Sequence, residues 1–430
     1  YVASPDQLGQ HLRNAFRTAV SGTPGPVHLD FEGRTGIPIT EREADLEVDF
    51  DPKFSHYPPF RPCADIESIK AALKVLGEAK RPVIVAGGGV TASDARAELI
   101  ALAERLSIPV ATALNAKAMF PTDHPLAVGT PGTYSRASTN KIVCEADLVF
   151  YIGSHTGSQV TNHYRVPPRS MPIIQLDIDA AEIGRNFPAK VGLHGDARAT
   201  LRQMLEIAEA GPQRTAWLDR VQELVAEWKD ETENLFTSED MPMRPERLCR
   251  EIENALPSNA ILVSDTGHAG IWTGAYIDFK HADQMFLRCA GSLGWGFPAS
   301  LGAKCAMPDR PVVCFTGDGG FWYHLTELDT ARKYGINTVT VVNNNHSLNQ
   351  EKSHNEHSIR GVSDNAEQFW LFPETDFARV AESMGCLGIV VHKPSEIGSA
   401  LDQALSADRP VVLDVRTHLE GIAPHGWFPA

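Results

Sequence analysis

The stretch Val312-Val-Cys-Phe-Thr-Gly-Asp-Gly-Gly320, with Thr338-Val-Thr-Val-Val-Asn-Asn-Asn345 after it, decides the fold. Each begins with a short apolar run of the kind that forms a parallel strand buried on both faces. The segment between them predicts a helix through Tyr334, so the whole is one βαβ unit. Ligands of open α/β sheets bind at the carboxyl ends of strands, and the polar residues at these two strand ends therefore predict a ligand site.

The residue types at these strand ends suit a phosphate–metal site. Asp318 offers a carboxylate, Asn345 an amide oxygen, and the loop after Asn345 a backbone carbonyl. Magnesium prefers six hard oxygens, often with phosphates among them. Gly317, Gly319 and Gly320 would let backbone amides approach a diphosphate, and the following helix would point its N-terminus at the anion. An Asp-Gly turn and an Asn-rich loop without a ligand is the alternative.

The composition is that of a globular protein with two to three domains. The chain has 430 residues, 43% of them hydrophobic and 22% charged. A net charge of −15 without a dense Lys/Arg cluster argues against a nucleic-acid or anionic-membrane partner. No apolar run is long enough to span a bilayer. The seven scattered cysteines form no Cys-x-x-Cys pair, so we expect no disulfide framework or zinc site, and a cytoplasmic location.

Strand and helix patterns alternate along most of the chain, which predicts an α/β fold with two doubly wound parallel-sheet domains. A helix over residues 5–20 and a strand over 27–31 precede them, and we interpret this αβ unit as the C-terminal remnant of a third domain. The expected divisions are a remnant at 1–36, a linker at 37–61, a middle domain at 62–209, a second linker at 210–243 and a C-terminal domain at 244–430.

The βαβ unit resembles the Gly-Asp-Gly…Asn-Asn signature of thiamine-diphosphate-dependent enzymes, within the acetolactate synthase and pyruvate oxidase group. The resemblance runs over essentially the whole chain. It implies that Asp318 and Asn345 are the side-chain ligands of Mg²⁺ and that Ser347 supplies a backbone oxygen.

Two further segments resemble the same family. Asp265-Thr-Gly-His268 is similar to the family's first diphosphate-binding turn, which implies that Gly267 and His268 contact the phosphates. Gly291-Ser-Leu-Gly-Trp-Gly-Phe-Pro-Ala299 is similar to the segment under the bent cofactor, which implies cofactor contacts from Gly291, Ser292 and Leu293. Leu293 would be the apolar wedge that forces the two cofactor rings into a V; an ordinary core leucine is the alternative.

The resemblance also gives residues 1–36 a meaning. Gly25-Pro-Val-His-Leu-Asp30 looks like the last strand of the family's pyrimidine-binding domain. We therefore expect most of that domain, with the glutamate that activates the cofactor, to lie upstream of this sequence. Family analogy further implies a homotetramer with active sites at subunit interfaces.

A flavin is the third expected cofactor. Ala86-Gly-Gly-Gly-Val90 follows a predicted strand and could bind a dinucleotide, although a tight turn explains it as well. Further segments are similar to the FAD-contacting segments of flavin-containing relatives, which implies a structural FAD. Other family members keep this fold without a flavin, which is the alternative. The implied FAD contacts are Gly87, Gly88, Gly89, Gly129, Gly153, Ser154, Asp177, Asp179 and Asp196.

The loop after the asparagines departs from the family pattern, because Asn349 and Gln350 stand where a glycine and an apolar residue are usual. We interpret both as catalytic. A polar amide there could hold a water or a carbonyl oxygen, as resemblance to cyclohexane-1,2-dione hydrolase would imply; a role in a loop hydrogen-bond network is the alternative. Residues Glu351–Asn365 are expected to form a lid.

The predicted function is thiamine-diphosphate- and Mg²⁺-dependent cleavage or formation of a C–C bond next to the carbonyl of a small ketonic substrate. The specific hypothesis is a hydrolase or lyase that opens a cyclic 1,2-dione. Acetolactate-synthase-type decarboxylation and carboligation of 2-keto acids is the first alternative. A non-catalytic nucleotide-binding protein of the same fold is the second.

Overall fold

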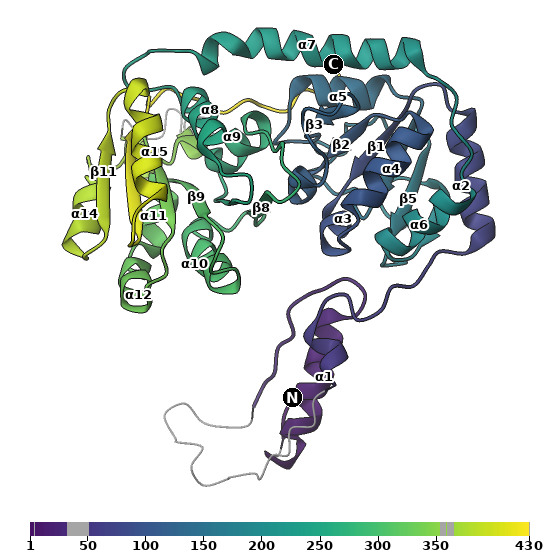
Figure 1. Cartoon of the computed structure of the whole chain (residues 1–430), viewed down its shortest axis with the longest axis horizontal. Coiled ribbons are helices and arrows are strands. Elements are labelled where there is room, and N and C mark those ends of the chain that lie inside the picture. Colours follow the sequence, from purple (N-terminus) through teal and green to yellow (C-terminus); the bar gives the residue numbers. More distant parts are fainter. Residues whose placement is uncertain (4, 32–50, 353–357, 359–364, 430) are drawn as a thin grey trace.

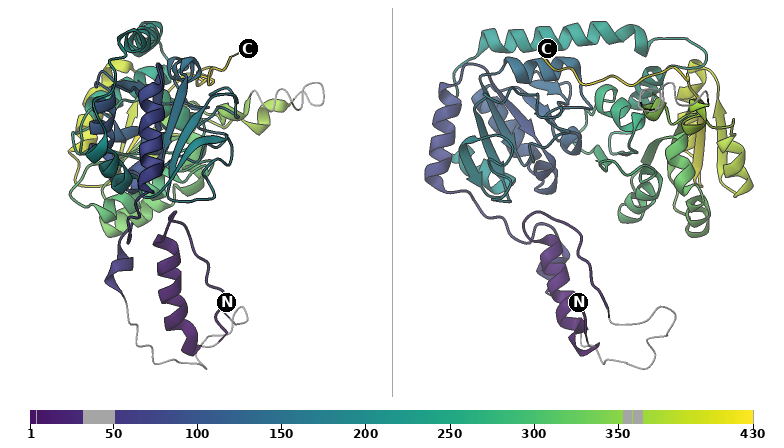
Figure 2. Two further views of the ribbon diagram at one scale, coloured as in Figure 1. Left: turned by 90° about the vertical axis from the view of Figure 1, so that its right-hand side faces the viewer. Right: turned by 180° about the vertical axis from the view of Figure 1, so that it is seen from behind.

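The computed structural model describes residues 1–3, 5–31, 51–352, 358 and 365–429. It contains two parallel β-sheets with helices on their faces, arranged side by side beneath one long helix (Figure 1). An N-terminal segment extends away from both, as the views in Figure 2 also show. Its one long helix is α1 (Leu8–Val20), preceded by a 3₁₀ turn at Pro5–Gln7.

The first sheet has the strand order β3-β2-β1-β4-β5-β6, with every pairing parallel. Its strands are β1 (Pro82–Ala86), β2 (Val110–Thr112), β3 (Ala127–Gly129), β4 (Leu148–Ile152), β5 (Ile173–Asp177) and β6 (Ala189–His194). Its helices are α2 (Ile66–Glu78), α3 (Gly88–Ala92), α4 (Arg96–Leu106), α5 (Ala137–Glu145) and α6 (Ala197–Ile207), with a 3₁₀ segment η4 (Leu114–Met119).

The second sheet has the order β11-β12-β10-β9-β7-β8, again with every pairing parallel. Its strands are β7 (Ile261–Ser264), β8 (Met285–Arg288), β9 (Val312–Gly317), β10 (Val339–Asn344), β11 (Leu387–Val391) and β12 (Val411–Arg416). Its helices are α8 (Pro245–Ala255), α9 (His268–Tyr276), α10 (Gly296–Ala306), α11 (Asp318–His324), α12 (Glu327–Tyr334), α14 (Phe377–Ser383) and α15 (Ile397–Leu405).

The predicted fold class is confirmed: two doubly wound parallel sheets, each covered by helices. The apolar runs became the central strands, and every residue of β1, β4, β5, β7 and β10 is buried. Helices on both faces leave such strands no solvent-facing side, which is why their sequences do not alternate.

Helix α7 (Thr215–Phe236), within the predicted second linker, packs on both domains. Trp217, Val221 and Leu224 belong to the hydrophobic core beside β1 and β4. Trp228 and Phe236, further along the same face, belong to the core of the second sheet. The helix lies across both domains in Figure 1, so the connection is a rigid packed element.

Several local predictions are wrong. Residues 27–31 form no strand; Phe31 makes only an isolated bridge with Val2, and a strand needs a continuous partner. The helix expected through Tyr334 is divided into α11 and α12. Strands β3 and β6 were not predicted: β3 has only three residues, and edge strand β6 (Ala-Lys-Val-Gly-Leu-His) alternates apolar residues with Lys, Gly and His and so lacks a continuous apolar run.

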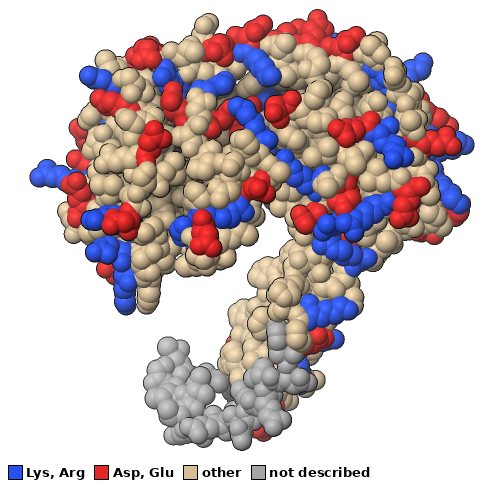
Figure 3. All heavy atoms as spheres, viewed as in Figure 1, with Lys and Arg blue, Asp and Glu red and all other residues tan. Residues whose placement is uncertain are grey.

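Other predictions fall partly outside the described residues. Positions 32–50 cover the end of the predicted remnant and most of the first linker, and most of the predicted lid at Glu351–Asn365 is likewise outside the description. Within the described parts, no helix combines the length and the apolarity needed to cross a bilayer. All seven cysteines are free. On the face shown in Figure 3, basic and acidic side chains are interspersed.

Candidate active site

The strand order of the second sheet reverses between β7 and β9, and a cavity of about 390 Å³ lies at the carboxyl ends of these strands and β10. Most residues predicted to bind the diphosphate and its metal line this cavity. They are Gly267, His268, Gly291, Leu293, Gly317, Asp318, Gly319, Gly320, Asn345 and Ser347. Asn349 and Gln350 also line it. Ser292 is exposed and does not, so its predicted cofactor contact is not supported by the geometry.

Asp318 begins α11 directly after β9 and is only 2% exposed. Its Oδ1 accepts a hydrogen bond from the Gly319 N–H (2.7 Å) and its Oδ2 accepts one from the Ser347 N–H (2.9 Å). Burial raises the pKa of Asp318 to about 7, although these backbone N–H groups act in the opposite direction. Within the described residues no Lys or Arg forms an ion pair with this carboxylate, so a bound metal ion would compensate its buried charge.

The three consecutive asparagines divide between two faces of β10. Asn343 and Asn345 line the cavity, and Asn343 Oδ1 is buried without a hydrogen-bond partner among the described residues. Asn344 points to the other face, where its Nδ2 donates to Asp414 Oδ1 (2.7 Å) and to the Thr375 carbonyl (3.0 Å). Strand alternation thus brings Asn345 to the side of Asp318 and makes Asn344 structural.

These oxygens fit a Mg²⁺–diphosphate group. Asp318 supplies one carboxylate and Asn345 one neutral amide oxygen, and the Ser347 backbone is already within hydrogen-bond reach of Asp318. Ser347 Oγ is buried with no partner in the described part of the chain. One carboxylate with neutral oxygens suits a Mg²⁺ ion that is also bound by phosphates. Within that part, no three His, Cys, Asp or Glu side chains cluster as an all-protein metal centre.

The glycines of the Gly-Asp-Gly-Gly turn differ in how closely their neighbours pack. A Cβ on Gly320 would lie 2.4 Å from Asp265 Oδ2, and one on Gly319 would lie 2.5 Å from Leu348 Cδ2. A Cβ on Gly317 would meet no atom within 4 Å. Close packing therefore leaves no room for a side chain at Gly319 and Gly320, whereas it leaves room at Gly317. All three line the cavity, so their contact with a diphosphate stays a prediction.

Asp265, at the end of β7, supports this turn and was not predicted as a site residue. It is fully buried, and its carboxylate accepts hydrogen bonds from Thr316 Oγ1 (2.8 Å), the Thr266 N–H (2.8 Å) and the Gly294 N–H (3.1 Å). Burial raises its pKa, with these hydrogen bonds opposing the shift. Asp265 joins the loops after β7 and β9 to the segment that carries Leu293. The sequence does contain a signal for Asp265, because it is the first residue of the Asp265-Thr-Gly-His268 turn that resembles the family's diphosphate-binding turn.

Gly267 and His268 form the start of α9 on the other side of the cavity. Gly267 has φ +70°, in the left-handed region that favours glycine. Burial, together with nearby His425, lowers the pKa of His268 to about 4, so its ring is neutral at pH 7. A neutral imidazole can donate one hydrogen bond to a phosphate oxygen but offers it no charge.

Leu293 is half-buried at the cavity wall and lies near Gly267, whose added Cβ would be 3.9 Å from Leu293 Cδ1. The cavity wall is where the predicted wedge would have to lie, so the role of Leu293 stays a prediction that its position permits.

Asn349 takes part in a loop network and also faces the cavity. Its Nδ2 donates to the carbonyls of Leu419 and Gly421, both at 2.8 Å. Its Oδ1 is buried without a partner among the described residues. The neighbouring Gln350 side chain lies over Gly267, with Oε1 3.2 Å from the position of an added Cβ. The loop-network alternative is thus supported for the amide nitrogen, and the oxygen remains available to a ligand.

Tyr134 is a cavity residue that the sequence did not indicate. It comes from the middle domain and lines the same cavity as Asp318. Because its position depends on the packing of one domain against the other, no local motif could have identified it.

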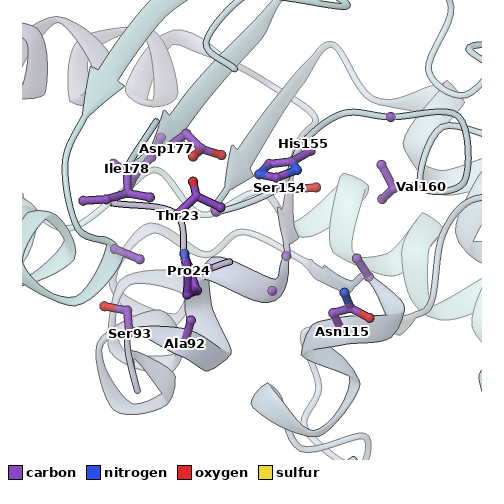
Figure 4. Close-up of a pocket in the computed structure, with 18 of the residues that line it drawn as sticks. Thr23, Pro24, Ala92, Ser93, Asn115, Ser154, His155, Val160, Asp177 and Ile178 are labelled. Atoms are coloured by element: carbon purple, nitrogen blue, oxygen red, sulfur yellow. The ribbon is translucent and has the colours of Figure 1, made fainter. Parts of the chain in front are cut away.

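A second cavity of about 420 Å³ lies at the corresponding point of the first sheet, where the strand order reverses between β1 and β4 (Figure 4). Predicted flavin contacts that line it are Gly87, Gly88, Gly89, Gly153, Ser154, Asp177 and Asp196. Gly129 and Asp179 do not line it: a Cβ on Gly129 would meet Arg136 and Thr139, and Asp179 caps its own turn through the Ala181 N–H (2.9 Å). Thr23 and Pro24 of the N-terminal segment also face this cavity.

The Gly-Gly-Gly turn of this cavity is held by backbone packing. A Cβ on Gly87 would lie 2.3 Å from the Gly153 carbonyl oxygen, and one on Gly89 would lie 2.6 Å from Gly153 Cα. Asp196 is engaged with Ser93 Oγ (2.6 Å) and Arg61 Nη1 (3.2 Å). Asp177 Oδ2 is buried without a partner among the described residues, and burial raises its pKa. Asp177 is therefore the acidic group of this cavity that could accept a hydrogen bond from a ligand hydroxyl.

Comparison with known proteins matches both domains. Residues 69–204 match the family described as "Thiamine pyrophosphate enzyme, central domain", and residues 265–415 match "Thiamine pyrophosphate enzyme, C-terminal TPP binding domain". The second match contains the Asp318 cavity, and the first contains most of the Asp177 cavity. Thiamine pyrophosphate is another name for thiamine diphosphate.

Three relatives illustrate the similarity. A probable acetolactate synthase large subunit of Methanocaldococcus jannaschii is 34% identical over 426 residues, covering 96% of this chain and 70% of the relative. The acetolactate synthase large subunit of Corynebacterium glutamicum is 33% identical, covering 96% of this chain and 66% of the relative. Glyoxylate carboligase of Escherichia coli O157:H7 is 31% identical, covering 94% and 69%. The chain belongs to the thiamine pyrophosphate-dependent enzymes of the acetolactate synthase-like family.

Proposed function

We propose that the protein decarboxylates a 2-keto acid and joins the remaining fragment to a second carbonyl compound, as an acetolactate-synthase-type carboligase. The observation that carries the proposal is the Asp318–Asn345–Ser347 oxygen set in a cavity within the matched cofactor-binding domain. Relatives named as synthases and a carboligase support this reading better than the hydrolytic one. The whole enzyme's activity is inferred from relatives of which this chain spans about two thirds.

In this proposal each residue at the cavity has one task. Asp318, Asn345 and the Ser347 backbone would hold Mg²⁺, and Gly267 and His268 would contact the diphosphate. Bound thiamine diphosphate would supply an electron sink for the carbanion formed when the C–C bond breaks. Leu293 would orient the cofactor from the cavity wall, and Tyr134 would help to exclude water from it.

The assembly is proposed to be a homotetramer whose active sites lie at subunit interfaces. Tyr323 supports this, because it lines the Asp318 cavity and yet is 63% exposed. Trp322, next to it on α11, is 43% exposed. Large aromatic side chains exposed beside a cavity are typical of a surface that another subunit covers.

FAD is proposed for the cavity between β1 and β4. The support is a cavity at the sheet's reversal point, lined by Gly88, where an added Cβ would lie 3.3 Å from Asn115 Cβ, and by the unpartnered Asp177 carboxylate oxygen. Its proposed role is structural.

The test is product analysis with the full-length protein. Pyruvate and, separately, a panel of other 2-keto acids are supplied with Mg²⁺ and thiamine diphosphate, and the products are followed by NMR. The proposal expects acetolactate or a related 2-hydroxy-3-keto acid, with carbon dioxide release. No turnover of any 2-keto acid, despite Mg²⁺-dependent cofactor binding, would contradict it. No cofactor binding at all would support a non-catalytic protein of the same fold.

A second candidate is hydrolytic opening of a cyclic 1,2-dione, which only Asn349 favours. Its buried Oδ1 has no partner among the described residues and lies at the cavity, where it could accept a hydrogen bond from water. The same preparation would be given cyclohexane-1,2-dione. A ring-opened acid that disappears in Asn349→Ala, while thiamine diphosphate still binds, would establish this candidate; absence of the acid would remove it.

A further inference from the structure

Helix α9 connects the diphosphate site with the middle domain. Its N-terminal end, Gly267 and His268, lines the Asp318 cavity. At its C-terminal end the last carbonyls lack partners within the helix, as at every helix terminus. Two basic side chains of the middle domain donate hydrogen bonds to these carbonyls. Lys117 Nζ donates to the Gly274 carbonyl (2.8 Å), and Arg136 Nε donates to the Ala275 carbonyl (2.8 Å).

Lys117 is an unusual residue at this position because it is buried without an ion-pair partner. It is 2% exposed, and the Gly274 carbonyl is the sole acceptor that the described residues give its Nζ. Burying an ammonium group is costly, so a lysine here needs a purpose that a hydrophobic residue could not serve. Burial and the neighbouring Arg136 lower the pKa of Lys117 to about 7.

Arg136 is fixed from three sides. Besides Ala275, it forms an ion pair with Asp278, just beyond the end of α9, and its guanidinium lies 4.2 Å from the centre of the Trp228 ring. It is 5% exposed. Such a planar group held by several contacts keeps a defined position.

The helix also approaches the middle domain closely along its glycines. A Cβ on Gly274 would lie 2.8 Å from Leu114 Cδ2 and 3.1 Å from the Tyr134 carbonyl oxygen. A Cβ on Gly270 would lie 3.4 Å from the Tyr134 ring. The helix therefore has little freedom to slide while its C-terminal carbonyls are held.

We propose that Lys117 and Arg136 are positioning residues for the cofactor site: by holding the C-terminal carbonyls of α9, they fix Gly267 and His268 at its other end. The inference rests on the proposed function, because it takes the Asp318 cavity to bind thiamine diphosphate. A helix of nine residues spans only about 13 Å, so a change in tilt at one end displaces the other. The guanidinium of Arg136 at the C-terminus also complements the helix dipole, whose positive end faces the cavity.

The test compares Lys117→Met with Arg96→Met in the full-length protein. Met keeps most of the apolar length of Lys117 and removes its charge and its hydrogen bond to α9. Arg96 is the control, since its Nη1 donates across the same domain interface to the Ala282 carbonyl (3.0 Å) and within its own domain to the Ala118 carbonyl (2.9 Å), and none of its hydrogen bonds is to α9. We expect Lys117→Met to weaken Mg²⁺-dependent thiamine diphosphate binding about 5- to 10-fold. Arg96→Met should leave the affinity within about 2-fold, even where its Tm falls.

A second measurement needs no cofactor. Hydrogen exchange of the first-turn amides of α9 in the cofactor-free proteins should be faster in Lys117→Met than in wild type and unchanged in Arg96→Met. This readout decides the inference even where the wild-type protein binds no thiamine diphosphate, a result that would overturn the proposed function alone. Equal exchange in all three proteins, or equal losses of affinity in both variants, would overturn the positioning role.

A conservative variant covers the case in which Lys117→Met does not fold. Arg136→Lys keeps a cation beside Asp278 but removes the Nε donor to the Ala275 carbonyl. We expect an affinity loss of about 2- to 3-fold and faster exchange at Gly267–Ile271. Unchanged exchange there would contradict the inference.

Discussion

The two sheets place a cavity at the same topological point but line it differently. In each, glycines in the loop after a strand are required by close packing: Gly87 against Gly153 in the first sheet, and Gly320 against Asp265 in the second. Each cavity has a buried carboxylate, Asp177 in the first and Asp318 in the second. In the second, Asn345 and the Ser347 backbone add neutral oxygens at the strand ends, which is the donor set that Mg²⁺ prefers beside a phosphate. A glycine-rich turn therefore indicates only that two loops pack closely. The oxygen donors that line a cavity indicate which ligand it can bind.

The largest expected effect is on the affinity for thiamine diphosphate, when the acidic residue of each cavity is replaced by asparagine in a separate variant. Asp318→Asn should weaken Mg²⁺-dependent thiamine diphosphate binding at least about 100-fold, because it removes the only carboxylate of the proposed metal site. Asp177→Asn, in the other cavity, should leave that affinity unchanged. Isothermal titration calorimetry on both variants checks this. Similar losses of affinity in the two variants would show that the Asp318 cavity is not the specific site of the cofactor.

The glycine turns can be compared by stability. Gly320→Ala should cost about 2–3 kcal/mol in the free energy of unfolding, since its Cβ would lie 2.4 Å from Asp265 Oδ2. Gly317→Ala, with open space around its Cβ, should cost less than about 1 kcal/mol. Urea unfolding measures both. Equal costs would show that packing does not explain the turn.

The first sheet offers a matching pair of glycines, one tightly packed (Gly87) and one less so (Gly88). Gly87→Ala would bring a Cβ to 2.3 Å from a backbone oxygen, while Gly88→Ala would bring one to 3.3 Å from a side-chain carbon. We expect a large loss of stability for Gly87→Ala and a loss of FAD content, with little loss of stability, for Gly88→Ala. Flavin absorbance per protein molecule and Tm separate the two effects.

The sequence was sufficient for the sheet architecture and for the Asp318 site because both are local. Apolar runs mark strands buried on both faces, and strand alternation places Asn345 rather than Asn344 beside Asp318. Tyr134 and Lys117 could not be predicted, because their roles arise only when the domains pack together. The packing of Gly320 against Asp265 could not be predicted either, because the two residues are 55 positions apart in the sequence.

A smaller effect is expected from pH. The pKa of Asp318 is raised from 3.8 to about 7, so its contribution to stability is full below about pH 4 and is lost as the pH rises through 7. Mg²⁺ replaces the proton, and the gain in Tm on adding Mg²⁺ and thiamine diphosphate should therefore be larger at pH 8 than at pH 6. Thermal unfolding of Asp318→Asn should show no such difference; a gain independent of pH in the wild type would contradict the assignment.

The smallest effect concerns the C-terminal segment, which both regions hold through asparagine amides. Asn349 Nδ2 donates to the Leu419 and Gly421 carbonyls, and Asn162 Nδ2 donates to the Gly426 carbonyl (2.9 Å). Asn349→Gly should cost about 1 kcal/mol and speed hydrogen exchange near Leu419 but not near Gly426. An equal increase in hydrogen exchange near Leu419 and near Gly426 would contradict the prediction, because the two asparagines would then not hold the segment independently.

The central claim is that the cavity between β7 and β9 holds thiamine diphosphate through a metal on Asp318. A crystal structure of the full-length protein grown with Mg²⁺ and thiamine diphosphate tests it most directly. We expect a metal about 2.1 Å from oxygens of Asp318, Asn345 and the Ser347 backbone, with the diphosphate beside Gly267. Diphosphate density in the cavity between β1 and β4, or a metal that does not contact Asp318, would contradict it.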